Sequence, residues 1–210
     1  MFSNQIQDRK TYWEKRYSKQ GKRTVGNNCL SEDEFLNSTM QIESFMSNTF
    51  KNCFGYKRVL DFGCGYGRIS KMLIKFCSEL YGVDLASWPI EQAKKLVSAG
   101  NFQTYDGQHL PFKDKFFGGF ITWTVLQHIH PDLIFLICKE LDRITDIGSK
   151  IILYENTTPW IEDSDYTWYR SSDDYKNLFP NYSEISKSDI DWFDGSSKEI
   201  HTLLVMQKVK

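Results

Sequence analysis

The sequence lacks an excess of either charge, because its 210 residues include 26 basic and 27 acidic side chains. Such a balance provides no strong electrostatic field for nucleic acid or for an anionic membrane surface. Long apolar runs are also missing: the stretch around Ile134–Cys138 is far shorter than the ~20 residues that a transmembrane helix requires. Residues 1–10 are polar and contain no apolar segment typical of a signal peptide. We therefore expect no nucleic-acid surface, no membrane association and no secretion.

Paired cysteines are absent as well. The five cysteines, at positions 29, 53, 64, 77 and 138, are odd in number and form no C-x-x-C motif. This pattern argues against a disulfide framework or a zinc site and suits free thiols in a reducing compartment. An apolar content of 40%, with 15% aromatic residues, argues against disorder. We therefore expect a cytoplasmic globular chain, long enough for one domain, and its oligomeric state stays open.

One stretch predicts a strand, a glycine-rich turn and a helix in direct succession. The apolar strand Arg58–Phe62 is followed by Gly63, Gly65 and Gly67 in strict alternation. Glycine permits positive φ and lets a ligand approach the backbone closely. Apolar residues then recur at helical spacing, at Ile69, Met72, Leu73 and Phe76. A helix that begins after such a turn is typical of a nucleotide site on a doubly wound sheet. A tight turn with incidental glycines is the other interpretation.

The spacing of the glycines helps to distinguish between nucleotides. A dinucleotide-binding turn has the pattern G-x-G-x-x-G. Counted from Gly63, the third glycine of that pattern would fall at position 68, where this chain has Arg68. The third glycine of this chain is Gly67, one residue earlier. A second predicted strand, Leu80–Asp84, ends in a carboxylate 19 positions after Gly65. A carboxylate at that strand end can accept hydrogen bonds from both hydroxyls of a ribose.

These features resemble the class I S-adenosylmethionine-dependent methyltransferases. The resemblance covers about residues 55–155 and consists of four motifs in order: Asp61-x-Gly63-x-Gly65-x-Gly67, Gly82-Val83-Asp84, Asp106-x-x-x-Leu110-Pro111-Phe112 and Val125-Leu126-x-His128-Ile129. It implies an α/β fold: a doubly wound, Rossmann-like, seven-stranded sheet, mostly parallel, with a C-terminal antiparallel hairpin and helices on both faces.

The resemblance also implies a cofactor site for S-adenosylmethionine, with S-adenosylhomocysteine as the product. The glycine turn and the following helix would hold the amino-acid tail, with Asp61 anchoring the turn or meeting the ammonium group. Asp84 would accept the ribose hydroxyls, and Asp106 the adenine amino group. The residues assigned to the cofactor are therefore Asp61, Gly63, Cys64, Gly65, Gly67, Asp84, Leu85, Asp106 and Gly107. A turn-capping role for Asp106 before Gly107 is the alternative.

The rest of the chain alternates between helical and strand patterns, which predicts parallel β-α units. Further strands are expected at 102–105, 116–125 and 151–154, and a hairpin at 182–192 and 199–209. Ser87 and Pro89 open a helix that Gly100 ends, and Pro131 opens one that Gly148 ends. Residues 1–56 contain two further helical patterns, and the second is expected to begin after Ser31, as an N-cap with an acidic first turn through Glu34, and to end near Phe50. We therefore divide the chain into an N-terminal helical extension or cap, 1–56, and a methyltransferase domain, 57–210.

His128 is the predicted catalytic residue, because it follows the fourth strand and a histidine titrates near neutrality. A structural histidine that bonds the backbone at the strand–helix turn is the alternative. No metal site is expected, since His128-x-His130 has no third ligand nearby in sequence.

The predicted substrate residues surround the ends of the fourth and fifth strands: Tyr12, Trp13, Gln127, Asn156, Trp160 and Arg170. Tyr12 and Trp13 either pack onto the core or close over the cofactor. The long segment 156–170 is rich in aromatic and acidic residues, with Glu162, Asp163 and Asp165 among them. Long loops of this kind are often binding loops, and this composition favours a compact or cationic acceptor over a polyanion.

Three functions fit these patterns. The first is a methyltransferase that moves a methyl group to an O or N nucleophile of a small molecule or short exposed group. The second is a non-catalytic subunit that binds S-adenosylmethionine and supports a partner. The third is a nicotinamide-dependent oxidoreductase, which Arg68 disfavours because it replaces the last glycine of the dinucleotide pattern.

Overall fold

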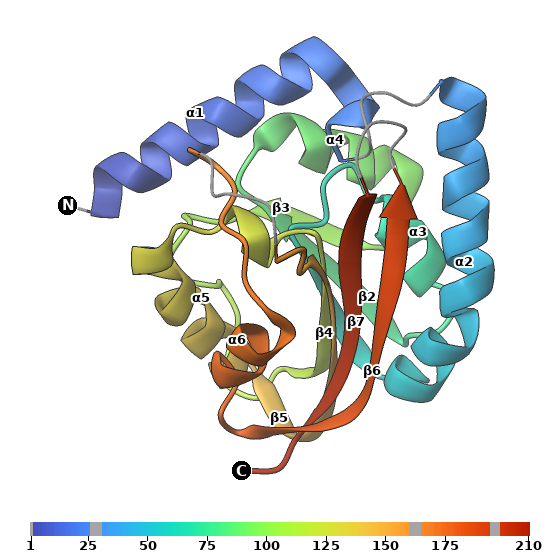
Figure 1. The fold of residues 1–210 in the computed structure, drawn as a ribbon, viewed down its shortest axis with the longest axis vertical. Coiled ribbons are helices and arrows are strands. Elements are labelled where there is room, and N and C mark those ends of the chain that lie inside the picture. Colours follow the sequence, from blue (N-terminus) through green and yellow to red (C-terminus); the bar gives the residue numbers. More distant parts are fainter. Residues whose placement is uncertain (1, 26–30, 160–164, 194–197) are drawn as a thin grey trace.

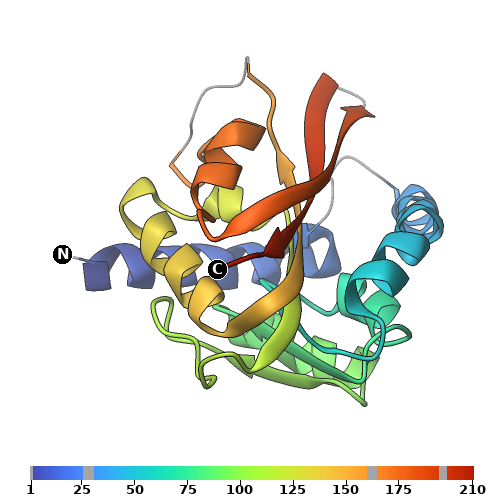
Figure 2. The ribbon, with the colours of Figure 1, turned by 90° about the horizontal axis from the view of Figure 1, so that it is seen from below.

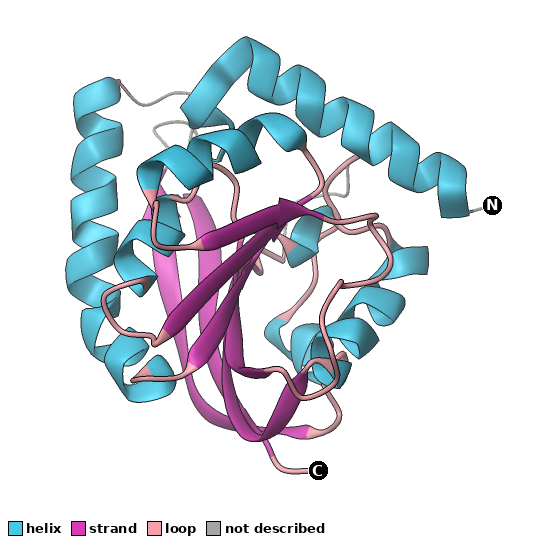
Figure 3. Ribbon diagram, turned by 180° about the vertical axis from the view of Figure 1, so that it is seen from behind, coloured by secondary structure: helices cyan, strands magenta, loops and turns pink. Residues whose placement is uncertain are grey.

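A seven-stranded sheet forms the centre of the computed structural model, which describes residues 2–25, 31–159, 165–193 and 198–210. The strands lie in the order β3-β2-β1-β4-β5-β7-β6, and Figure 3 shows the sheet in magenta with helices around it. The pairs from β3 to β5 are parallel, whereas β7 is antiparallel to both β5 and β6. The strands are β1 (Arg58–Phe62), β2 (Glu79–Asp84), β3 (Asn101–Thr104), β4 (Phe117–Trp123), β5 (Thr145–Asn156), β6 (Tyr182–Phe193) and β7 (Lys198–Lys208). The predicted fold class is confirmed.

Helices cover both faces of this sheet (Figures 1 and 2). One face carries α2 (Glu32–Phe54), α3 (Arg68–Leu73) and α4 (Ser87–Leu96), and the other carries α5 (Pro131–Arg143) and α6 (Ser172–Asn177). The first helix, α1 (Phe2–Gln20), crosses one end of the molecule and continues into the short 3-10 helix η1 (Gly21–Val25). A second 3-10 helix, η2 (Leu126–His128), follows β4.

Alternation along the central strands divides the buried side chains between two cores. In β1, Val59 faces the core under α2, α3 and α4, while Leu60 faces the core under α5. Phe120 and Ile121 of β4 divide in the same way, and both are fully buried. Burying one such side chain contributes ~1.5–3 kcal/mol. The two cores therefore fix the register of the sheet, and with it the edge where the strands end.

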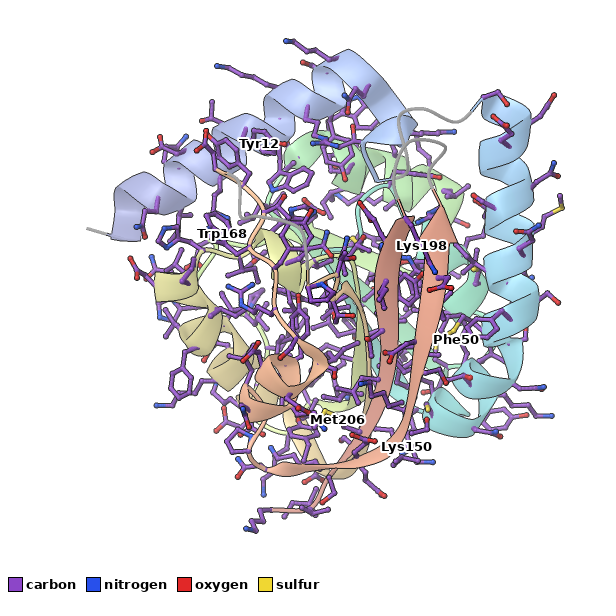
Figure 4. All side chains as sticks on the ribbon, viewed as in Figure 1. Tyr12, Phe50, Lys150, Trp168, Lys198 and Met206 are labelled. Atoms are coloured by element: carbon purple, nitrogen blue, oxygen red, sulfur yellow. The ribbon has the colours of Figure 1, made fainter. Side chains whose placement is uncertain are left out.

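The helix α2 begins where the sequence indicates, because Ser31 and Glu34 form a reciprocal capping box. It continues beyond its expected end near Phe50 to Phe54, and both phenylalanines are fully buried against the sheet (Figure 4). This half of the extension is thus built into the core. The division into 1–56 and 57–210 stays a prediction.

Three helices end earlier than the sequence suggested. The helix predicted to extend to Gly148 ends at Arg143, and Gly148, with φ +82°, lies inside β5. The cause is pairing with β4: Phe117 lies beside Thr145, so the strand has already begun. The helices expected to reach Phe76 and Gly100 end at Leu73 and Leu96. Periodicity alone missed these ends because the chain leaves each helix to join the sheet.

Candidate functional site

The glycine turn lies at the carboxyl end of β1, between β2 and η2. Gly63, Gly65 and Gly67 all have positive φ, at 73°, 54° and 89°. The amide of Gly63 donates to the Val83 carbonyl at 2.9 Å, and a Cβ on Gly63 would lie 2.5 Å from a methyl of Val125. A side chain at this position is therefore excluded by both conformation and space. The turn leads directly into α3, whose N-cap is Gly67.

Asp84, at the end of β2, holds the turn from the other side. One carboxylate oxygen accepts from the Gly65 amide and the other from the Ala86 amide, both at 3.0 Å. Burial raises the pKa of Asp84 to about 6, although these two hydrogen bonds lower it. The ionised form therefore gains from a ligand that brings hydroxyl donors or positive charge.

Asp61 is a second buried carboxylate beside the turn, and it is 1% exposed. It accepts a 2.6 Å hydrogen bond from the hydroxyl of Ser70 in α3. Burial raises its pKa to about 7, and the nearby charge of Asp84 acts in the same direction. This geometry fits the turn-anchoring role expected of Asp61. Cys64 is buried with them, and burial raises the pKa of its thiol well above the usual value.

The predicted adenine end of the site lies where β3 ends. One oxygen of Asp106 accepts from the amides of Gln108 and His109 at 2.8 and 2.7 Å, so this carboxylate caps the turn. Gly107 has φ +88°, and a Cβ there would come within 2.6 Å of Ile6 and 3.2 Å of Leu85. Gly107 and Leu85 are therefore adjacent, as the resemblance implied, and Ile6 from α1 packs onto them.

The helix α1 covers the ends of the strands from this point onward. The Glu14 carboxylate accepts from the amide and the hydroxyl of Ser87 at 2.7 and 2.9 Å, which ties α1 to the first turn of α4. Tyr17 is 3% exposed and packs against the Trp88 ring with 5.5 Å between centroids. The charge of Asp84 helps burial to raise the pKa of Tyr17, so Tyr17 lies near Asp84.

His128 lies in η2, under the same helix. Its Nδ1 is 2.8 Å from the carbonyl oxygen of Tyr166 and 3.2 Å from the hydroxyl of Thr167. Because a carbonyl only accepts, Nδ1 carries the proton and Nε2 presents a lone pair. Burial lowers the pKa of His128 to about 4, so the ring is neutral. Trp13 packs edge-on against it at 5.1 Å, which brings two predicted site residues together.

Glu155, near the end of β5, supports the turn that carries His128. Its carboxylate accepts from the Thr122 hydroxyl at 2.8 Å and from the amides of Val125, Leu126 and Gln127 at 3.2, 3.1 and 3.3 Å. Burial raises the pKa of Glu155 to about 7 against the effect of these hydrogen bonds. The carboxylate thus satisfies three backbone donors that would otherwise be buried without acceptors.

Gln127 is oriented by the next strand. Its Oε1 accepts from the Asn156 amide at 2.9 Å, so its amino group is turned toward Nε2 of His128, 3.4 Å away. The Asn156 side chain is engaged elsewhere, with Thr158 and Glu199. The structure therefore brings Gln127 to His128 but uses the Asn156 side chain to join β5 to β7.

The segment 165–170 closes over η2 and meets α1. Trp168 donates its amide to the Gln127 carbonyl at 2.7 Å, and Arg170 donates to the carbonyls of Leu126 and Ile129 at 3.1 and 3.0 Å. The rings of Tyr12 and Tyr166 stack with 3.9 Å between centroids. Tyr12 and Trp168 both lie at the end of the molecule that α1 crosses (Figure 4). Trp160, also predicted here, lies outside the described residues.

Several residues at this site had no motif to reveal them. Arg9 and Ile6 belong to the face of α1 that packs on the strand ends, and the spacing of Ile6, Arg9, Trp13 and Tyr17 is the helical signal that could have found them. Glu155 carried no such signal, because its role depends on the turn after β4.

Among the described residues, no group of three or more His, Cys, Asp or Glu could hold a metal ion. No described helix is both long and apolar enough for a membrane span.

The fold and this site define a class I S-adenosylmethionine-dependent methyltransferase domain. Its marks are the strand order, the glycine turn at the end of β1 and the carboxylate at the end of β2. Residues 60–153 match the methyltransferase domain family, so the chain carries a domain of that family.

Individual relatives agree with this assignment. The mitochondrial ubiquinone biosynthesis O-methyltransferase of Schizosaccharomyces pombe is 38% identical over 65 residues, which are 30% of this chain and 23% of that protein. The PH0226 protein from Pyrococcus horikoshii OT3 superposes with a TM-score of 0.70 at 19% identity, over 92% of this chain and 98% of that chain. A SAM-dependent methyltransferase from Methanosarcina mazei superposes with a TM-score of 0.66 at 18% identity, over 73% and 93% of the two chains. The two structures share the fold.

Proposed function

We propose that this chain transfers the methyl group of S-adenosylmethionine to a hydroxyl oxygen of a small molecule. The cofactor fits the residues present. Asp84 is a buried carboxylate that can accept from ribose hydroxyls, and the Gly63–Gly67 turn has the positive φ angles that let a ligand approach its backbone. Leu85 and Gly107 supply an apolar surface for the adenine, with Asp106 at its edge. When bound, the cofactor supplies an electrophilic methyl group on a cationic sulfur.

The observation that carries oxygen as the acceptor atom is the fixed tautomer of His128. Its Nδ1 proton is held by the Tyr166 carbonyl, so the lone pair is on Nε2, which lies 3.4 Å from the Gln127 amide nitrogen, and the ring packs against Trp13. A hydroxyl must lose its proton as its oxygen forms the new bond, and a neutral imidazole at this place can accept that proton as a general base. The relative from Schizosaccharomyces pombe is also described as an O-methyltransferase.

The proposed step balances as an in-line displacement. The acceptor's O–H bond breaks and its proton passes to Nε2 of His128, while an O–CH3 bond forms. The S–CH3 bond breaks, and its electron pair stays on sulfur, which becomes the neutral thioether of S-adenosylhomocysteine. Positioning by α1 and the 165–170 segment, which meet at Tyr12 and Tyr166, brings the two reactants together and excludes water.

The alternatives make different predictions. Replacing His128 by Asn keeps a donor for the Tyr166 carbonyl but removes the base. We expect turnover to fall by about 10²- to 10⁴-fold, with unchanged affinity for S-adenosylhomocysteine in calorimetry. The matched control is His130→Asn, because His130 is the N-cap of α5 and asparagine is a good N-cap.

Full turnover by the His128→Asn variant would contradict the proposed base. Cofactor binding without any methyl transfer would instead favour the non-catalytic partner subunit. The nicotinamide oxidoreductase has no support left, because residues 60–153 match the methyltransferase domain family.

A further inference from the structure

Arg9 is a buried cation for which the described part of the chain provides no hydrogen-bond or ion-pair partner. Its side chain lies in α1 and the residue is only 6% exposed. Across the described ranges Arg9 makes no hydrogen bond or ion pair, and its Nε is buried without an acceptor. A guanidinium stays charged even where burial lowers its pKa, as it does here. Such a group is costly for the folded protein, because buried charges are normally paired.

Arg9 lies between the predicted adenine end of the site and His128. It lies between Ile6, which packs on Gly107, and Trp13, which packs on His128. The groups that respond to its charge are the Tyr105 hydroxyl, just after β3, and the His128 ring, just after β4. Neither is a carboxylate. Among the described residues, therefore, the guanidinium has aromatic neighbours and no carboxylate paired with it, although the charges of Asp84 and Asp106 also act on the Tyr105 hydroxyl.

We propose that Arg9 binds a carboxylate group of the methyl acceptor, so that the substrate is a small hydroxylated carboxylic acid. This inference rests on the proposed O-methyl transfer and narrows its substrate class. A guanidinium and a carboxylate match as two parallel, charge-assisted hydrogen bonds. Such an acceptor supplies the missing partner of Arg9 and places its hydroxyl within the pocket that His128 lines.

The charges near His128 favour an anionic acceptor for a second reason. Arg9 and Arg16 both act with burial to lower the pKa of His128. A carboxylate bound at Arg9 offsets this positive field, so substrate binding makes the imidazole a stronger base. The acidic loop residues that favoured a cationic acceptor do not oppose this: Asp165 is exposed, and Glu162 and Asp163 lie outside the described residues.

The cofactor also has a carboxylate, on its amino-acid tail, and its expected place is the glycine turn. The basic groups there are different: Lys22 lies 5.8 Å over the ring of Tyr66, and Arg68 begins α3 beside Asp61. Arg9 is associated with Tyr105 and His128 instead. Arg9 is therefore apart from the basic groups at the glycine turn, and the test has to separate the two carboxylates.

The test measures binding of acid and amide probes to the full chain saturated with S-adenosylhomocysteine. The probes are 4-hydroxybenzoate and 3-hydroxyphenylacetate, each paired with its carboxamide, titrated by NMR. We expect at least one acid to bind about tenfold or more tightly than its amide. In Arg9→Met this preference disappears, while Arg9→Lys keeps part of it. The control Lys10→Met removes an exposed charge from the same helix and leaves the preference intact.

Thermal unfolding of the ligand-free variants gives an independent readout. Arg9→Met removes an unpaired buried charge, so we expect its Tm to equal or exceed that of the wild type. A lowered Tm, with the acid preference retained, makes Arg9 structural and overturns the proposal. Equal binding of acids and amides, or no binding of either, also overturns it.

A loss of S-adenosylhomocysteine affinity in Arg9→Met, with no change in the acid preference, overturns the proposal by assigning Arg9 to the cofactor. A different result would refute the proposed O-methyl transfer, namely full activity of the His128→Asn variant. The binding measurements on Arg9 do not depend on turnover, so the two proposals can fail separately.

Discussion

At the scale of single residues, the main feature of the site is a pair of buried carboxylates. A ligand that brings hydroxyl donors or positive charge would stabilise their ionised form. Asp84 and Asp61 lie beside the glycine turn, and burial raises their pKa values to about 6 and about 7. In each case backbone or hydroxyl donors only partly offset the loss of water. The sequence predicted both carboxylates, because each stands at or near the end of a short apolar strand. Their raised pKa values could not be predicted, since they depend on how completely α1 and α3 cover them.

The raised pKa values predict that cofactor affinity depends on pH. Ribose hydroxyls and a cationic cofactor favour ionised Asp84 and Asp61, so affinity is high above pH 7 and falls as the pH drops through about 7 and 6. Replacing Asp84 by Asn removes a charged acceptor, and we expect ~10- to 100-fold weaker binding at pH 8. Its pH dependence should also be smaller. Calorimetry between pH 5 and 8 measures both effects.

Asn is the appropriate substitution, because its amide oxygen can still accept one of the two hydrogen bonds that Asp84 receives, from the Gly65 or the Ala86 amide. Affinity that is constant from pH 5 to 8, or an Asp84→Asn variant that binds like the wild type, would remove Asp84 from the cofactor site.

At the scale of elements, the turn η2 is held by the neighbouring strand rather than by its own sequence. The carboxylate of Glu155 reaches from β5 to the amides of Val125, Leu126 and Gln127. These hydrogen bonds hold the turn that carries His128, and no pattern in the sequence predicts them. Elements with strong local signals were predicted well, as the Ser31–Glu34 capping box and the glycine turn show. Elements that depend on pairing, such as the early start of β5 at Thr145, were not.

Replacing Glu155 by Leu tests this support. The change leaves three backbone donors and the Thr122 hydroxyl without their acceptor, at ~1–3 kcal/mol for each buried group left unsatisfied. We expect a clear drop in Tm and in kcat, with a smaller effect on S-adenosylhomocysteine affinity.

The variant Glu155→Gln is the matched control. Its carbonyl can take over the three hydrogen bonds that Oε1 receives from Thr122, Val125 and Leu126, so most of the stability should return. If Leu and Gln at position 155 lower the Tm equally, the carboxylate does not support the turn in this way.

At the scale of the whole molecule, the N-terminal helix α1 covers a site that is formed by the ends of the strands β1 to β5 and the turns that follow them. The helix α1 packs on Gly107, caps α4 through Glu14 and stacks on Tyr166, so it touches both ends of the site. The seven-stranded, mostly parallel sheet followed from the sequence through the family resemblance. An N-terminal cap was also predicted, but not the strand ends and turns that α1 contacts, because contacts between residues so far apart leave no local pattern. Arg9 belongs to this unforeseen part of the site.

The central claim is that the protein methylates a hydroxyl with His128 as the base, and one NMR measurement tests it. The full chain is incubated with S-adenosylmethionine carrying a ¹³C-labelled methyl group and a small-molecule extract of the cells that make the protein. The account predicts new signals in the chemical-shift range of O-methyl groups with the wild type and with His130→Asn, but not with His128→Asn. Label transferred to nitrogen or sulfur, or equal O-methyl signals with His128→Asn, would contradict it.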